Sequence, residues 1–311
     1  MIAAQRRAFK MGRPRDRFRL IAAVISCAAP LVLLAIVVVL YLEAAPAIAR
    51  FGPRFLVTRN WNPVTLDFGA LPFVYGTLVT SAIALVIAVP VGIAVATVLA
   101  EPGVQWLRGA VGTAVELLAA IPSVVYGIWA LYVLGPFAFE HIELPMSERL
   151  GWIGFFGGPP RQTSLFAAAL ILAVMVLPTL SAVSRDVLRA VPAGLRESSR
   201  ALGATWWETH WRVVIPAARG GIFGASILAL GRALGETIAV TMVIGNRPEI
   251  PASIFSPAYT LASVIANEFT EATGDVYPAA LVELGLVLIL VTLVINALAL
   301  LLVRSTTGRR R

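Results

Sequence analysis

The chain is 311 residues long, is 59% hydrophobic and carries a formal net charge of +8. Soluble domains contain about 45–50% apolar residues, so this composition favours a membrane protein and argues against an ordinary soluble domain. The basic residues lie between apolar runs, where they mark membrane topology, and we therefore expect membrane lipid around the chain and no nucleic-acid partner.

Six apolar segments are long enough to cross about 30 Å of hydrocarbon at roughly 20 residues each. They cover residues 20–42, 74–100, 109–134, 165–184, 220–245 and 277–303. We therefore predict an all-α, polytopic membrane protein with six transmembrane helices. The first segment is longer than the apolar run of a cleaved signal peptide, so we expect it to remain as an anchor.

The segments and their loops divide the chain into five units. These are a basic cytoplasmic tail at 1–19, a first transmembrane anchor at 20–42, a periplasmic loop at 43–73, a five-helix core at 74–303 and a second basic tail at 304–311. Eighteen of the 25 Lys and Arg residues lie in the tails, at Arg108 or in the core loop at 185–219. The positive-inside rule then places that loop and both termini in the cytoplasm.

The third apolar segment contains Pro122 near its middle, and a proline at this place is expected to break or kink the helix. The loop at 135–164 follows it and contains the stretch GFFGGPPRQ. Glycine and proline punctuate chain structure strongly, so we predict an irregular periplasmic loop there.

The core loop at 185–219 is predicted to form two short helices. The first covers 193–202, and Gly203 supplies the left-handed residue that commonly ends a helix. The second begins at Thr205, which forms a T-x-x-E capping box with Glu208. Pro216 is expected to stop this second helix, because proline lacks the N–H that a helix interior needs.

Three tryptophans, Trp206, Trp207 and Trp211, crowd the second of these helices. Trp207 and Trp211 are four residues apart and therefore share one helix face. Two interpretations stay open. The helix lies at the lipid interface, where tryptophan is common, or it docks on another protein.

The same loop resembles the EAA loop of ABC importer permeases, in which Glu-Ala-Ala precedes a glycine by three residues and Ile-x-Leu-Pro follows nine residues later. The chain has ESSRALG at 197–203 and VVIP at 213–216 with this spacing, although two serines replace the alanines and Val213 and Ile215 replace Ile and Leu. The resemblance implies that the loop forms coupling helices that fit a groove on a separate ATPase subunit. The residues that it assigns to coupling are Glu197, Gly203, Ala204, Thr205, Trp207, Glu208 and Pro216.

Two charged residues, Arg232 and Glu236, lie within the fifth apolar segment. Each costs on the order of 2.5–3.5 kcal/mol at a helix centre, so a lipid-facing position is improbable. Four residues apart on a helix, they are predicted to share a face. They form either a mutually neutralised pair or the polar lining of a substrate path. The small-xxx-small glycines predicted to make a close helix interface beside them are Gly220, Gly224, Gly231 and Gly235.

The residue types that several enzyme classes need are missing. Lys10 is the single lysine and no GxxxxGK[ST] loop leads to it, so we do not expect this chain to hydrolyse ATP by itself. His141 and His210 lie far apart in the sequence and Cys27 is the single cysteine, which predicts no metal site. No GxSxG motif is present, and no catalytic residue is predicted.

Three stretches are similar to the phosphate-specific ABC permeases of the PstC type: AIPSVVYGIWALYVLGP at 120–136, LALGRALGETIAVTMVIGN at 228–246 and TLASVIANEFTEA at 260–272. The resemblance implies a type I ABC importer permease in the bacterial inner membrane. The partners that it implies are a PstA-type permease, two PstB-type ATPase subunits and a periplasmic PstS-type phosphate-binding protein. ATP and Mg²⁺ would be bound by the ATPase, and this chain would hold no cofactor.

The resemblance also implies that Arg232 and Glu236 matter for transport. Arg232 offers planar donors suited to phosphate oxygens. We expect Glu236 to neutralise it in part and to accept the proton of a P–OH group, which sulfate lacks near neutral pH. Glu283, in the sixth apolar segment, is interpreted as a packing carboxylate, with a counter-ion for Arg232 as the alternative.

Rival functions are a permease for another oxyanion, such as sulfate or molybdate, and a stand-alone ion-coupled carrier. The GRALGET segment argues against the first and the EAA spacing against the second. A membrane-embedded enzyme is the weakest reading, because no nucleophile–base or metal constellation is present.

Overall fold

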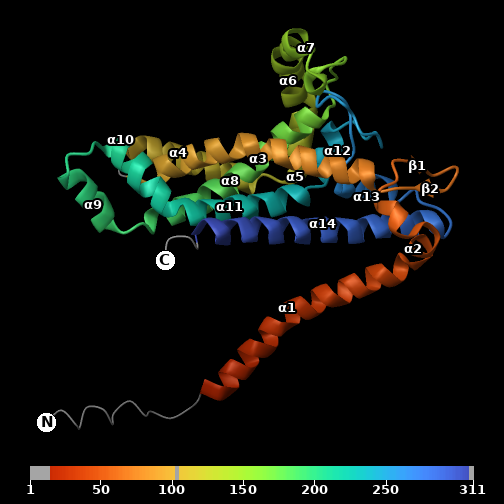
Figure 1. Cartoon of the computed structure of the whole chain (residues 1–311), viewed down its shortest axis with the longest axis horizontal. Coiled ribbons are helices and arrows are strands. Elements are labelled where there is room, and N and C mark those ends of the chain that lie inside the picture. Colours follow the sequence, from red (N-terminus) through yellow and green to blue (C-terminus); the bar gives the residue numbers. More distant parts are fainter. Residues whose placement is uncertain (1–14, 102–104, 308–311) are drawn as a thin grey trace.

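The computed structural model describes residues 15–101 and 105–307, and these residues are mostly helical (Figure 1). The α-helices are α1 (Arg15–Glu43), α2 (Ala45–Phe51), α3 (Leu71–Ala100), α4 (Gln105–Ala120), α5 (Ser123–Trp129), α6 (Gly135–Ala138), α7 (Leu144–Leu150), α8 (Leu165–Arg189), α9 (Ala193–Ala201), α10 (Trp206–Thr209), α11 (Ile215–Leu234), α12 (Ile238–Val243), α13 (Leu261–Glu268) and α14 (Val276–Thr307). The shorter elements are the 3-10 helices η1 (Gly52–Leu56) and η4 (Gly154–Phe156), the π-helices η2 (Ala130–Leu134), η3 (Phe139–Glu143) and η5 (His210–Val214), and the strands β1 (Trp61–Asn62) and β2 (Asp67–Phe68).

Within the described residues, six helical stretches are long and apolar enough to cross a membrane. They are Ile25–Glu43, Leu71–Ala100, Ser123–Leu150, Leu165–Arg189, Trp206–Leu234 and Val276–Val303. The all-α, polytopic prediction is therefore confirmed. The largest differences from the predicted segments concern the third, which is displaced toward the C-terminus, and the fifth, which begins and ends earlier.

The long helices α3, α8, α11 and α14 form a bundle in which α3 packs on α8, α8 on α11 and α11 on α14 (Figure 1). The helices of the predicted coupling loop, α9 and α10, lie at one end of this bundle. The hairpin β1–β2 and α13 lie at the other end, α1 leaves the bundle obliquely, and α6 and α7 project away from it.

The third predicted segment is broken at Pro122, where the prediction allowed either a break or a kink. Pro122 adopts an extended conformation (φ −62°, ψ 146°), which ends α4 and begins α5. Proline also disfavours the helical conformation for the residue before it. The prediction of an irregular loop at 135–164 was wrong in its first part, because the helix that starts at Ser123 continues to Leu150.

In the two helical stretches Ser123–Leu150 and Trp206–Leu234, three prolines each lie two residues after a π-helical turn. Pro136 follows η2, Pro145 follows η3 and Pro216 follows η5. In each turn the backbone bonds reach five residues back, as from Ile215 N–H to the His210 carbonyl. The wider turn relieves the clash between the proline ring and the preceding turn of the helix. The prediction that Pro216 stops its helix was therefore wrong: the helix passes through it to Leu234.

The predicted periplasmic loop at 43–73 is an ordered layer of α2, η1 and the hairpin β1–β2. Trp61 and Phe68 face each other across the hairpin and pack at ring centroid distances of 4.7 Å, and Phe68 stacks on Tyr277 at 5.3 Å. The Glu268 carboxylate accepts hydrogen bonds from Trp61 Nε1 at 2.8 Å and from the Tyr277 hydroxyl at 2.7 Å. Nearby, burial raises the pKa of Tyr259, so that hydroxyl stays protonated.

The helix bundle depends on small residues where backbones approach closely. Ala84 and Ala88 of α3 are fully buried, and a Cβ built on Gly92 would lie 2.7 Å from Leu180 Cδ2 of α8. A Cβ on Gly76 would overlap the backbone carbonyl oxygen of Tyr259. Small side chains at helix contacts are the usual solution in membranes, where apolar burial alone does not drive helix association.

We expect Gly76→Ala to lower the stability of the folded chain by about 1–3 kcal/mol, because the added methyl group meets backbone that has no rotamer to change. The measurement is the midpoint of thermal unfolding of the purified protein in detergent. Gly285→Ala is the matched control, since no atom lies within 4 Å of its Cβ position in α14. Equal midpoints for the two variants would contradict this packing.

Candidate functional site

The predicted coupling loop has the geometry that its sequence indicates. α9 covers Ala193–Ala201, and Gly203 has a φ of +88°. Thr205 Oγ1 accepts from the Glu208 amide at 3.3 Å, while Glu208 Oε2 accepts from the Thr205 amide at 2.9 Å, so the capping box is confirmed. Leu202, at the tip between the two helices, is 89% exposed. The loop therefore presents apolar as well as polar surface outward.

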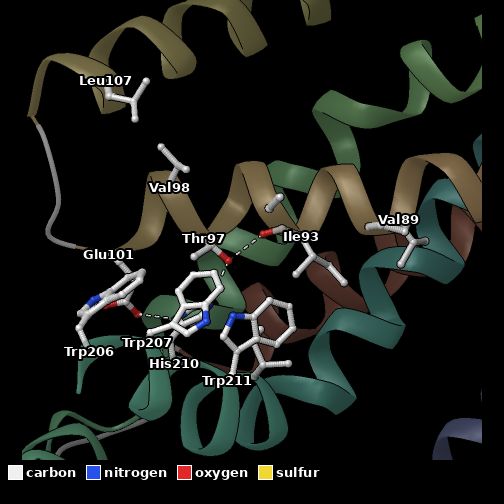
Figure 2. A pocket seen from close by; sticks show the side chains of 13 residues that line it. Val89, Ile93, Thr97, Val98, Glu101, Leu107, Trp206, Trp207, His210 and Trp211 are labelled. Atoms are coloured by element: carbon white, nitrogen blue, oxygen red, sulfur yellow. Dashed lines mark hydrogen bonds and ion pairs between the residues drawn. The ribbon is translucent and has the colours of Figure 1, made fainter. Parts of the chain in front are cut away.

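The tryptophans form one wall of a groove of about 580 Å³ at this end of the bundle (Figure 2). The shared face of Trp207 and Trp211 is confirmed by a ring centroid distance of 5.5 Å, and Trp206 stacks on His210 at 5.4 Å. The opposite wall is α3, from Val89 to Val98, with Glu101 directly after it and Leu107 of α4 at the edge.

The sequence interpretation missed three residues that meet under this groove: Glu101, Arg196 and His210. Arg196 NH2 lies 3.1 Å from Glu101 Oε1, and His210 Nδ1 lies 3.6 Å from the same oxygen. Glu101 is 4% exposed and His210 is 1% exposed. A lone carboxylate directly after a 30-residue apolar helix was the available signal, but its partners lie about 100 residues further along the chain.

Basic side chains also surround the C-terminal end of α3. Arg189 NH2 donates to the Leu99 carbonyl at 2.7 Å, and Arg108 NH2 donates to the Glu101 carbonyl. The last carbonyl groups of a helix lack partners within the helix and carry partial negative charge, so arginines stabilise them. The end of α3 is thus held by α4, α8, α9 and the turn after α10.

Arg232 and Glu236 do not share a helix face, which corrects the prediction. α11 ends at Leu234, Gly235 lies outside the helix, and Glu236 and Thr237 are non-helical before α12 starts at Ile238. No ion pair joins Arg232 to Glu236 within the described residues. The physical reason is that α11 ends before its next turn, so the i, i+4 spacing does not bring the side chains together. The interpretation as a neutralised pair is therefore wrong.

Arg232 instead lines an open hollow of about 600 Å³ between α8, α11 and α14. Thr179 of α8 and Asn296 of α14 add polar groups to its wall, and the Asn296 Oδ1 atom is buried without a hydrogen-bond partner among the described residues. The other lining residues are Gly224, Ile227, Leu228, Gly231 and Leu300. A cation with neutral donors and acceptors around it is suited to an anion.

The Cβ positions of three of the predicted interface glycines are uncrowded. No atom lies within 4 Å of a Cβ built on Gly224, and the nearest atoms to Gly231 and Gly235 are 3.9 Å away. Within the described chain, the glycine of α11 that permits close approach is Gly221, whose Cβ would overlap Val187 of α8. The predicted interface role of Gly220, Gly224, Gly231 and Gly235 stays a prediction.

Glu283 lies on α14 and is 8% exposed. No ion pair connects it to Arg232 among the described residues, which disfavours the counter-ion alternative. No group of three or more His, Cys, Asp or Glu residues in the described ranges is arranged to hold a metal ion.

Comparisons with known proteins give three kinds of match. A family model described as "Binding-protein-dependent transport system inner membrane component" matches residues 88–308. The chain is 51% identical over 257 residues to the phosphate transport system permease protein PstC of Mesorhizobium japonicum, covering 81% of this chain and 79% of the relative. It is 41% identical over 316 residues to the protein of the same name from Haemophilus influenzae, covering 99% and 100%. Among solved structures, a bacterial ABC transporter involved in the import of alginate matches with a TM-score of 0.59 at 18% identity, covering 93% of this chain and 96% of that one.

Proposed function

The chain belongs to the family of binding-protein-dependent transport system inner membrane components, and we propose that it is the permease subunit of an ATP-driven importer of inorganic phosphate. The observation that carries the proposal is likeness along nearly the whole chain to relatives named as phosphate transport system permeases. The chain is a multi-pass membrane protein with the fold of an ABC importer permease.

The subunit works in an assembly. A second permease of the PstA type completes the translocation path, two PstB-type ATPases bind ATP and Mg²⁺, and a PstS-type protein delivers phosphate from the periplasm. Both termini and the loop with α9 and α10 face the cytoplasm, in keeping with their basic residues. The exposed Leu202 tip and the left-handed Gly203 support docking of this loop on an ATPase.

Phosphate crosses by way of the hollow beside Arg232. The guanidinium donates charge-assisted hydrogen bonds to phosphate oxygens, and Thr179 and Asn296 offer further polar contacts. Because no carboxylate pairs with Arg232 within the described chain, its positive charge is available to the anion. The hollow is open, which suits a site that must release its ion. When the helices around the hollow move against each other, the site becomes accessible from the other side of the membrane, which is alternating access.

A competition experiment tests the substrate assignment. Vesicles that contain the assembled transporter and its binding protein are given labelled phosphate with an excess of unlabelled phosphate, sulfate or molybdate. Unlabelled phosphate is expected to abolish the signal, and the other two oxyanions are expected to leave it nearly unchanged. Stronger competition by sulfate or molybdate than by phosphate would reject the assignment.

Glu236→Gln is expected to lower the preference for phosphate over sulfate by about tenfold, because an amide oxygen accepts from a P–OH group without the charge assistance that a carboxylate gives. Glu236 is half-buried in the break between α11 and α12, and no ion pair joins it to Arg232 within the described residues. The measurement is uptake of both ions by vesicles with the binding protein present. Glu249→Gln, at an exposed residue of the following loop, is the control. An unchanged ratio for Glu236→Gln would remove Glu236 from selectivity.

A further inference from the structure

We propose that Glu101 is the positioning residue through which movement of the coupling loop reaches α3. This inference rests on the proposed function, because it assumes that α9 and α10 dock on an ATPase. It assigns a role to a carboxylate that lies outside the EAA-like segment and outside the hollow beside Arg232.

The two coupling helices meet at one side chain. Arg196 extends from α9 and His210 follows α10, and both approach Glu101 Oε1, at 3.1 Å and 3.6 Å. His210 also contacts α3 a second time, because its Nε2 lies 3.0 Å from Thr97 Oγ1. The Thr97 hydroxyl already donates to the Ile93 carbonyl at 2.8 Å, so its oxygen accepts from His210 Nε2, and His210 Nδ1 forms an ion pair with Glu101 only when the ring carries both protons.

α11 and α3 are connected to the coupling loop in different ways. Movement of α10 passes directly into α11 and toward Arg232, since the helix is continuous from Trp206 to Leu234. α3 has no such covalent link, because it ends about 100 residues before the loop. Its end is nevertheless tied to α9 through Glu101 and to the turn after α10 through Thr97 and, when His210 is protonated, Glu101. α3 in turn packs along α8, which carries Thr179 of the hollow.

The burial of Glu101 keeps its carboxylate paired with Arg196. In an apolar setting an unpaired charge is costly, so the Glu101 carboxylate follows its cationic partner rather than losing it. Glu101 and His210 are almost fully buried, although both line the groove beside Trp206 and Trp211. Glu101 is far less exposed than a surface carboxylate, so water screens its pairing with Arg196 less, and a displacement of Arg196 is passed on to α3.

The test is the number of phosphate ions imported per ATP hydrolysed, in vesicles that contain the complete transporter. For Glu101→Gln we expect ATP hydrolysis and co-purification of the ATPase to be retained, and phosphate imported per ATP to fall about tenfold, within the range usual for coupling between sites. Glu116→Gln, at an exposed carboxylate on α4, is the control and should keep the wild-type ratio.

A second variant separates positioning from stability. Glu101→Gln removes a buried charge and leaves Arg196 uncompensated, so the single variant is also expected to be less stable. The double variant Glu101→Gln with Arg196→Gln removes both charges. We expect it to regain thermal stability while its import per ATP stays low. Recovery of the import ratio together with stability would overturn the inference, as would a normal ratio in the single variant.

These outcomes are distinct from a failure of the proposed function. If wild-type vesicles import no phosphate, the proposed function fails, whatever the variants do. If wild-type vesicles import phosphate and the Glu101 variants keep the wild-type ratio, the inference alone fails.

Discussion

Replacing Arg232 with glutamine is expected to lower phosphate uptake by the assembled transporter about 100-fold, which corresponds to roughly 2–3 kcal/mol for charge-assisted hydrogen bonds. Arg232 is exposed at the wall of the hollow between α8, α11 and α14. It has no ion-pair partner in the described chain, so its loss leaves no buried carboxylate behind. We therefore expect the variant to fold and assemble normally.

Two further variants sharpen this test. Arg232→Lys keeps the charge but loses the planar set of donors, so we expect uptake between that of Arg232→Gln and that of the wild type. Arg149→Gln removes an exposed arginine of α7, far from the hollow, and should transport normally. Co-purification of the other subunits reports assembly. Wild-type uptake by Arg232→Gln would mean that the hollow is not the path.

Gly203→Val is expected to abolish ATPase binding, and with it transport, while the membrane helices stay folded. Gly203 has a φ of +88°, and no atom lies within 4 Å of its Cβ position. Substitution therefore meets no steric obstacle outside the residue, and the whole effect comes from backbone conformation. The left-handed region costs an ordinary residue roughly 1–2 kcal/mol, and a β-branched residue more. The turn between α9 and α10 would then change shape.

The matched controls for Gly203 isolate this cause. Gly203→Asn tolerates the left-handed conformation and should retain most ATPase binding. Gly194→Val introduces the same side chain into α9, at a glycine with equal free space and no positive φ, where valine is a better helix former than glycine. The readouts are co-purification of the ATPase and the unfolding midpoint. Loss of binding in Gly194→Val equal to that in Gly203→Val would show that bulk, not conformation, is responsible.

Structural features that are determined by residues close together in the sequence could be predicted. The apolar segments, the helix at 193–201, the left-handed Gly203 and the Thr205–Glu208 capping box each rest on contacts within a few residues. Such signals are local, so one sequence contains them. The identity of the family also followed from local motifs, in the spacing of the EAA-like segment and in the stretch around Arg232.

The wrong predictions concern where helices end, because the same local sequence pattern is compatible with a helix that stops and with one that continues. Pro216 normally ends a helix, yet the π-turn η5 before it lets the helix continue. Arg232 and Glu236 have helix spacing, yet α11 ends between them at Leu234. A sequence pattern does not report whether a turn widens or a helix stops, because packing of α11 on α8 and α14 contributes to that choice.

The contacts of Glu101 could not be predicted, since they join residues about 100 positions apart through the packing of four helices. The sequence shows a carboxylate at the end of an apolar run, and such a residue is usually solvated at the membrane surface. The structure shows instead that Glu101 is buried, with His210 beside it (Figure 2) and Arg196 of α9 at 3.1 Å.

The central claim is that this chain moves phosphate only when a separate ATPase acts on its coupling loop. The most direct measurement is uptake of labelled phosphate into vesicles containing both permeases, with the ATPase, the binding protein and ATP each present or omitted. We predict uptake only when all three are supplied. Phosphate uptake driven by an ion gradient without ATPase or ATP would contradict the account and indicate a stand-alone carrier.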